Sequence, residues 1–170
     1  MDEVRNHPDK ITVLEFMPIV ELIMDSQGRC AGGVLYNMET EEYFTVKAKA
    51  TIIAIGIMVA AALEAADNLK QKGIDCRVLN IPTLKPIDEA AIIKAAAETG
   101  AIVTAEDHLE HGGLGSLIAQ VVAKHHPVPI EFVALKDTFA KSGKASELLQ
   151  RYGLTTKDIE RAVGEVIKRK

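Results

Sequence analysis

The hydrophobic and polar residues follow two different patterns along the chain, and the change comes near residue 51. In the first part, short apolar runs are separated by turn residues, and Phe44, Val46 and Ala48 alternate with polar neighbours. Strict alternation is typical of a strand with one buried face and one face in water. The pattern therefore predicts an antiparallel β-meander, with strands near residues 11–16, 19–25, 30–37 and 42–50.

From residue 51 onward, short apolar runs alternate with longer segments that have helical spacing. Such alternation is typical of a parallel sheet covered by helices on both faces. The predicted strands lie near residues 51–55, 75–81, 101–106 and 130–136, and the predicted helices near 57–72, 88–99, 114–125, 145–152 and 155–168. We expect a three-layer α/β/α fold with a mainly parallel sheet, extended at one edge by the N-terminal antiparallel meander.

Several helix ends have a local cause in the sequence. Gly73 and Gly100 follow predicted helices at positions where a left-handed residue ends a helix, and Asp88 is a good N-cap. Thr155 or Thr156 begins the last helix. No Ser/Gly-rich linker separates residues 1–50 from residues 51–170, so we expect one continuous folded unit joined at the strand 51–55.

Composition excludes several function classes. The chain has 170 residues, 48% of them hydrophobic, a net charge of -4, no Trp and only 4% aromatic residues. This composition is typical of a globular protein and argues against a nucleic-acid partner. Cys30 and Cys76 are too few for a disulfide framework or a four-cysteine zinc site. The charged start of the chain, and a longest apolar stretch at 52–63 that is too short to span a bilayer, predict a cytoplasmic protein without a membrane partner.

The glycine-rich segment 106–116 is the most chemically suggestive part of the sequence. It follows a predicted strand, and its glycines bring backbone N–H groups to a helix start, where an anion can bind weakly. Two nearby histidines can bind a borderline metal ion. The candidate residues are His108, His111, Gly112, Gly113, Gly115 and Ser116. The alternative is that acidic and histidine side chains of this loop cap the following helix or face a partner subunit, and crowded carboxylates argue against an anion.

Residues 56–170 resemble the C-terminal domain of transketolases and related thiamine-diphosphate enzymes. The stretches that carry the resemblance are GIMVAAALEAADNLKQKGIDCRVLNIPTLKPIDEAAI, TGAIVTAEDHLEHGGLGSLIAQVVA and VALKDTFAKSGKASELLQRYGLTTKDIERAV. In that family, thiamine diphosphate, its Mg²⁺ and the activating glutamate belong to the two preceding domains. The resemblance therefore implies a domain for packing and dimer assembly, with no cofactor of its own.

Residues 4–54 resemble the β-meander of the FAD domain in flavoprotein subunits of fumarate reductase and succinate dehydrogenase. CAGGVLYNMET and AKATIIA carry this second resemblance. The family binds the flavin pyrophosphate through an N-terminal GxGxxG turn that has no counterpart here, and Ile55 and Ile57 flank the single Gly56 of the remaining turn. We therefore expect no bound FAD.

The two resemblances meet in one short strand, and this favours the interpretation of an engineered or recombined chimera. Its expected purpose is structural, and we predict no enzyme activity, no cofactor and no small-molecule substrate. The alternatives are a non-catalytic assembly subunit or C-terminal fragment of a split transketolase, or a remnant FAD-binding module. Because the resembled domain normally packs against neighbours, a homodimer is a candidate assembly.

Overall fold

The computed structural model describes residues 19–24, 30–37, 42–46 and 48–170. The chain divides into two compact units, residues 1–47 and residues 48–170, and each is described by itself. The predicted strand at 11–16 lies outside the described residues. No helix in these described ranges has the length and apolar character needed to cross a membrane.

The first unit contains a three-stranded antiparallel sheet. Its strands are β1 (Ile19–Met24), β2 (Cys30–Asn37) and β3 (Glu42–Val46), in the order β1-β2-β3. Each strand pairs with the strand next to it in sequence, so that Leu22 lies opposite Gly33 and Leu35 lies opposite Phe44.

The second unit contains a four-stranded parallel sheet, as the sequence predicts. Its order is β5-β4-β6-β7, with strands β4 (Ala50–Ala54), β5 (Cys76–Asn80), β6 (Ile102–Leu109) and β7 (Ile130–Leu135). The helices are α2 (Met58–Gln71), α3 (Glu89–Thr99), α4 (Leu114–His125), α5 (Ala145–Arg151) and α6 (Thr156–Lys168). An α/β fold with a parallel sheet is therefore confirmed.

The described strands are assigned to a three-stranded and a four-stranded sheet. That the meander extends the parallel sheet at one edge, and that residues 1–50 and 51–170 form one continuous folded unit, both stay predictions.

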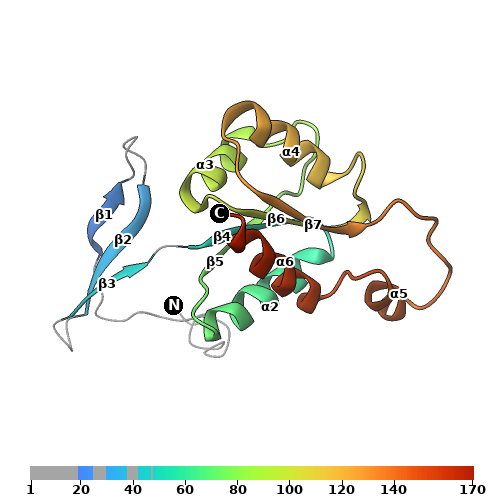
Figure 1. The fold of residues 1–170 in the computed structure, drawn as a ribbon, viewed down its shortest axis with the longest axis horizontal. Helices are drawn as coiled ribbons and strands as arrows, with labels where there is room; N and C mark the ends of the chain where they lie inside the picture. The colour runs from blue at the N-terminus through green and yellow to red at the C-terminus, as the bar shows by residue number, and fades with distance from the viewer. Residues whose placement is uncertain (1–18, 25–29, 38–41, 47) are drawn as a thin grey trace. The chain divides into compact units, whose positions relative to one another are not determined.

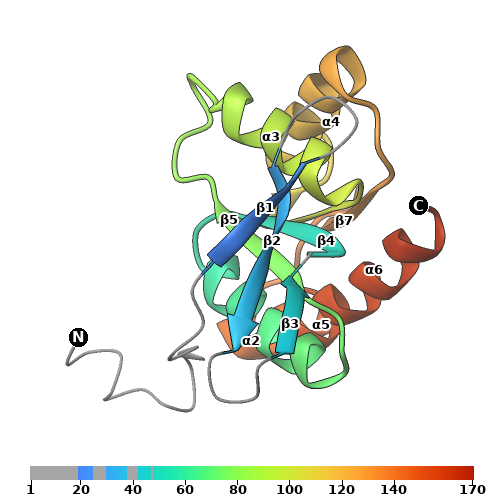
Figure 2. The same cartoon turned by 90° about the vertical axis from the view of Figure 1, so that its left-hand side faces the viewer.

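Helices cover both faces of the parallel sheet. Figure 1 and Figure 2 show α2 and α6 on one face and α3 and α4 on the other. Strand β4 is buried along its whole length, and its side chains alternate between the two layers, so Ile52 packs with the α2 and α6 side and Ile53 with the α3 and α4 side. The two cores therefore share one central strand.

The predicted helix ends are confirmed. The Asp88 side chain accepts a hydrogen bond of 2.9 Å from the Ala91 N–H at the start of α3, and Gly100 ends that helix with φ +63°. Gly73 follows α2 with φ +74°. Thr155 caps α6 in a reciprocal arrangement with Asp158.

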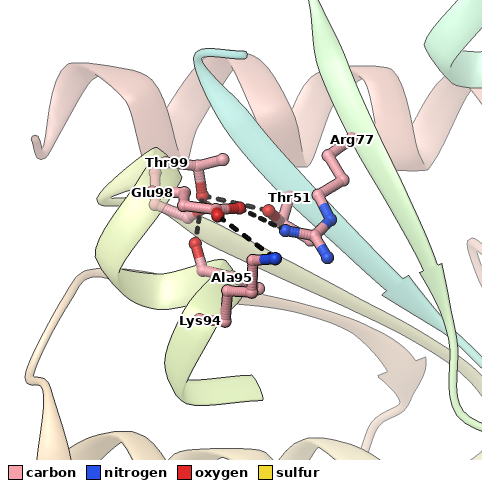
Figure 3. A network of polar contacts seen from close by, with 7 residues as sticks. Thr51, Arg77, Lys94, Ala95, Glu98 and Thr99 are labelled. Atoms are coloured by element: carbon pink, nitrogen blue, oxygen red, sulfur yellow. Dashed lines mark hydrogen bonds and ion pairs between the residues drawn. The ribbon is translucent and has the colours of Figure 1, made fainter. Parts of the chain in front are cut away.

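A polar network attaches the end of α3 to the first residues of the sheet (Figure 3). The Thr51 and Thr99 hydroxyls are 3.0 Å apart, and the Thr99 hydroxyl donates to the Ala95 carbonyl at 2.9 Å. Both threonines are buried. Arg77 on β5 pairs with Glu98 beside them. The network satisfies polar groups that an apolar core would otherwise leave without partners.

Candidate functional site

The loops at the carboxyl ends of β4, β6 and β7 form the candidate site. The helix after β4 covers one face of the sheet and the helix after β6 covers the other, so the chain diverges between these adjacent strands. Ligands of open α/β sheets bind at such a point. The two loops are close here, because a Cβ atom built on Gly56 would lie 3.6 Å from an Asp107 carboxylate oxygen.

Glu106 is the buried charge of this edge. Its side chain is 1% exposed and accepts hydrogen bonds from the Leu114 N–H at 2.7 Å and the Gly115 N–H at 2.8 Å. These are two of the N–H groups that the first turn of α4 cannot satisfy itself, and a carboxylate is favoured by the helix dipole at this end. Glu106 thus caps α4 from the preceding strand.

Gly113 and Gly115 are required by this packing. A Cβ atom on Gly113 would lie 2.0 Å from the Glu106 carboxylate, and one on Gly115 would lie 2.6 Å from the Phe132 ring. The same Gly115 Cβ would lie 2.9 Å from the Thr104 hydroxyl, which is buried and has no hydrogen-bond partner. The glycines let the helix start approach the sheet closely.

Ser116 closes the loop before the helix. Its hydroxyl accepts a 2.9 Å hydrogen bond from the Gly112 N–H and donates one of 2.8 Å to the Glu110 carbonyl. Glu110 in turn forms an ion pair with Lys136 beyond β7, and its N–H donates to the Leu135 carbonyl at 2.8 Å. The polar groups of the loop are therefore used to hold the loop itself.

The two histidines of the segment are exposed at its surface. His108 contacts the Leu109 carbonyl through Nδ1 at 3.1 Å, and His111 is likewise exposed. Within residues 48–170 and the described meander strands, no group of three or more His, Cys, Asp or Glu side chains is arranged to hold a metal ion. The Glu106 carboxylate lies at the helix start, as the capping alternative requires. Weak binding of an anion or a metal ion stays a prediction for the candidate residues His108, His111, Gly112, Gly113, Gly115 and Ser116.

One residue of this edge was not predicted from the sequence. Phe139 lies in the loop after β7 and is 100% exposed, and its only sequence signal is a single aromatic side chain within a polar run. The edge therefore combines a hydrogen-bonded polar loop with one fully exposed aromatic side chain.

The fold and this edge define a parallel α/β domain in which a carboxylate of the central sheet caps a helix. The chain belongs to the family of transketolase C-terminal domains, because the model of that family matches residues 45–159.

Curated relatives share this domain. The 6-deoxy-6-sulfo-D-fructose transketolase subunit SqwH of Clostridium sp. (strain MSTE9) is 48% identical over 120 residues, which are 71% of this chain and 37% of that protein. A subunit of the apulose-4-phosphate transketolase of Phocaeicola vulgatus is 36% identical over 149 residues, covering 84% of this chain and 47% of that protein. The chain thus spans less than half the length of these relatives.

A solved structure gives the same result. A chain described as a split gene transketolase, inactive beta4 tetramer, is 43% identical to this one and superposes with a TM-score of 0.70. The match covers 73% of this chain and 41% of that chain. The relative is thus an oligomer, whereas a homodimer of the present chain stays a prediction.

These comparisons correct two interpretations. The prediction that the chain is no enzyme is wrong at the level of the family, because its relatives are named as transketolase subunits. A chimera joined at 51–55 is not supported. The match to the Phocaeicola vulgatus protein covers 84% of the chain, which is more than residues 51–170 contain, so the match includes residues before the proposed junction. The family model also begins at residue 45, before the proposed junction. None of these three relatives is described as a flavoprotein.

Proposed function

We propose that this chain supplies the C-terminal domain of a split transketolase and acts together with a partner chain that binds thiamine diphosphate. The observation that carries the proposal is the 43% identity and the TM-score of 0.70 to a split gene transketolase chain. The curated relatives that are named as transketolase subunits support it as well.

The described residues do not fit thiamine diphosphate itself. A diphosphate needs a free helix start or a cluster of cationic groups, and a bound Mg²⁺ needs oxygen ligands. Here Glu106 occupies the start of α4, and the described residues contain no group of three acidic or histidine side chains arranged for a metal ion. The proposed role of this chain is therefore to complete the assembly, while the partner holds the cofactor.

The contacts of the second unit are consistent with a stable assembly domain. Its two apolar cores are continuous through β4, and long-range pairs such as Asn68 with Glu160 hold α2 to α6 at 2.8 Å. A rigid domain of this kind can dock on a partner without a large ordering cost.

The test is reconstitution. The chain is mixed with the subunit of its own organism that matches the cofactor-binding part of transketolases, and light scattering is recorded with and without thiamine diphosphate and Mg²⁺. We expect a complex of both subunits, with transketolase activity that neither subunit has alone. A thiamine-diphosphate enzyme subunit of another family serves as the control and should not associate.

A second measurement makes the proposal falsifiable without the partner. The thermal unfolding of this chain alone is recorded with thiamine diphosphate and Mg²⁺ in excess. A ligand at a hundred times its dissociation constant adds about 2.7 kcal/mol to the free energy of unfolding. We expect no shift; a shift of that size would overturn the assignment of the cofactor to the partner.

A further inference from the structure

We propose that Lys170 is a latch between the two helix layers, and that the latch opens when the positive charge of its side chain is removed. Helices α3 and α6 cover opposite faces of the parallel sheet (Figure 2). Lys170 follows α6, and its ammonium group contacts the end of α3, just before β6 begins. One side chain therefore connects the two layers around an edge of the sheet.

The contact is a hydrogen bond from a cation to a helix end. The Lys170 Nζ donates at 2.7 Å to the carbonyl of Thr99, which is the last residue of α3. The last carbonyl groups of a helix have no partner within the helix, and the helix dipole places partial negative charge on them. A positively charged donor is therefore favoured at this position over a neutral one.

Gly100 leaves room for the lysine stem beside this carbonyl. A Cβ atom on Gly100 would lie 3.0 Å from Cε and 3.6 Å from Nζ of Lys170. The first distance is closer than ordinary van der Waals contact, so a side chain at position 100 would push the lysine away. The residue that ends α3 also lets the latch approach.

Thr99 is a firmly held receptor for the latch. Its hydroxyl lies 3.0 Å from the Thr51 hydroxyl of β4 and donates to the Ala95 carbonyl at 2.9 Å (Figure 3). Both threonines are buried. Lys170 therefore binds to a part of α3 that is fixed to the sheet, so the contact restrains α6.

Arg169 holds the same end of α6 to a different element. Its guanidinium donates to the Ile130 carbonyl at 3.2 Å and forms an ion pair with Glu131, both at the start of β7. Arg169 thus attaches α6 to the sheet, whereas Lys170 attaches it to the opposite helix layer. The two neighbouring cations should therefore affect different parts of the chain when they are replaced.

Removing the lysine charge, as acetylation does, leaves a neutral group at the negative end of α3. Helix ends open locally more readily than the middle of a helix. We expect the ends of α3 and α6 to open more often, while the buried Ile159 and Val163 keep the rest of α6 on the sheet.

The experiment measures amide hydrogen exchange of the full chain by nuclear magnetic resonance. Two amides report on the latch: Gly100 N–H, bonded to the Ala96 carbonyl at 2.8 Å, and Arg169 N–H, bonded to the Val166 carbonyl at 3.1 Å. In Lys170→Gln both should exchange about 10-fold faster, because a hydrogen bond to a charged group is lost. The His126 N–H at the end of α4 should not change.

Three variants separate charge from position. Lys170→Arg keeps the charge and should exchange more slowly than Lys170→Gln. Lys168→Gln, which removes an exposed partner of Glu165 in the same helix, should exchange like the wild type. Arg169→Gln should accelerate exchange at the end of α6 and leave the Gly100 amide unchanged.

A Lys170→Gln variant whose Gly100 and Arg169 amides exchange like those of the wild type would overturn the proposal. Acceleration at Arg169 without acceleration at Gly100 would also overturn it, because the layers would then not be linked. A Lys170→Arg variant as fast as Lys170→Gln would show that charge does not close the latch. This test uses the chain alone, so its result is independent of the two-subunit assembly proposed above.

Discussion

Removing the Glu106 carboxylate should cost more stability than any exposed charge of the second unit. In Glu106→Ala, two backbone N–H groups at the start of α4, those of Leu114 and Gly115, lose their acceptor while they remain buried. Each buried donor without a partner costs about 1–3 kcal/mol, so the free energy of unfolding should fall by about 2–6 kcal/mol. This is a large part of the stability of an ordinary domain, which is about 5–15 kcal/mol.

The assay is urea unfolding followed by far-ultraviolet circular dichroism, since all described helices lie in residues 48–170. The matched control is Glu165→Ala, which removes an exposed carboxylate of α6 that pairs with Lys168 at 2.8 Å. Exposed pairs contribute about 0–1 kcal/mol, so the control should stay near the wild type.

A second substitution tests whether the Glu106 carboxylate lies against the backbone of Gly113. Gly113→Ala places a Cβ atom 2.0 Å from the carboxylate and should destabilise the wild type strongly. In the Glu106→Ala background the clash with the carboxylate is removed, while the approach of 2.9 Å to the Leu109 carbonyl remains, so the same change should cost less. If Glu106→Ala unfolds within about 0.5 kcal/mol of the wild type, the capping role of this carboxylate is refuted.

Three further predictions concern the rest of the second unit. Gly164→Ala should stabilise the chain by about 0.5–1 kcal/mol in urea unfolding, because this position lies inside α6 and a Cβ atom there meets nothing within 4 Å. Burial raises the pKa of the Cys76 thiol to about 11, and the nearby Asp75 adds to the effect. In a Cys30→Ala background, Cys76 should therefore react with a disulfide reagent at about pH 8 much more slowly than a free thiol does. The hydrogen bond from Lys72 lowers the pKa of Glu160 below its ordinary value of 4.5. The stability that this hydrogen bond provides is present at neutral pH and is lost as the pH falls below 4.5. A Lys72→Met variant should therefore lose less free energy of unfolding on acidification than the wild type.

Local sequence determined the helices and strands of the second unit and where most of them end. Asp88 bonds to a backbone group three residues later, and Gly100 ends its helix through its own φ of +63°, so neither needs any distant residue. The run at β4, apolar except for Thr51, likewise predicts a buried strand before any partner is known. Strand β6 is the exception, because it continues to Leu109 beyond the predicted end at 106. Its last residue pairs with Leu135 on β7, and no local pattern contains that partner.

The sequence alone left the role of the glycine-rich segment open between ligand binding and capping. Glycines and polar side chains before a helix suit both an anion-binding loop and a capping loop. The two roles differ in whether a carboxylate of the protein already lies at the start of α4. Glu106 reaches that position only because β6 and α4 pack closely, which the bare backbone at Gly113 and Gly115 allows.

Contacts between distant residues were decided by the tertiary structure. Thr51 and Thr99 are 48 positions apart and form one buried hydrogen bond, and Asn68 meets Glu160 across 92 positions. Local patterns carry no information on such pairs, because they depend on the order of the strands and on which face each helix covers. For the same reason, the sequence determined that Phe139 lies in a polar loop, and only the folded sheet placed it at the same edge as Ile57 and Leu109.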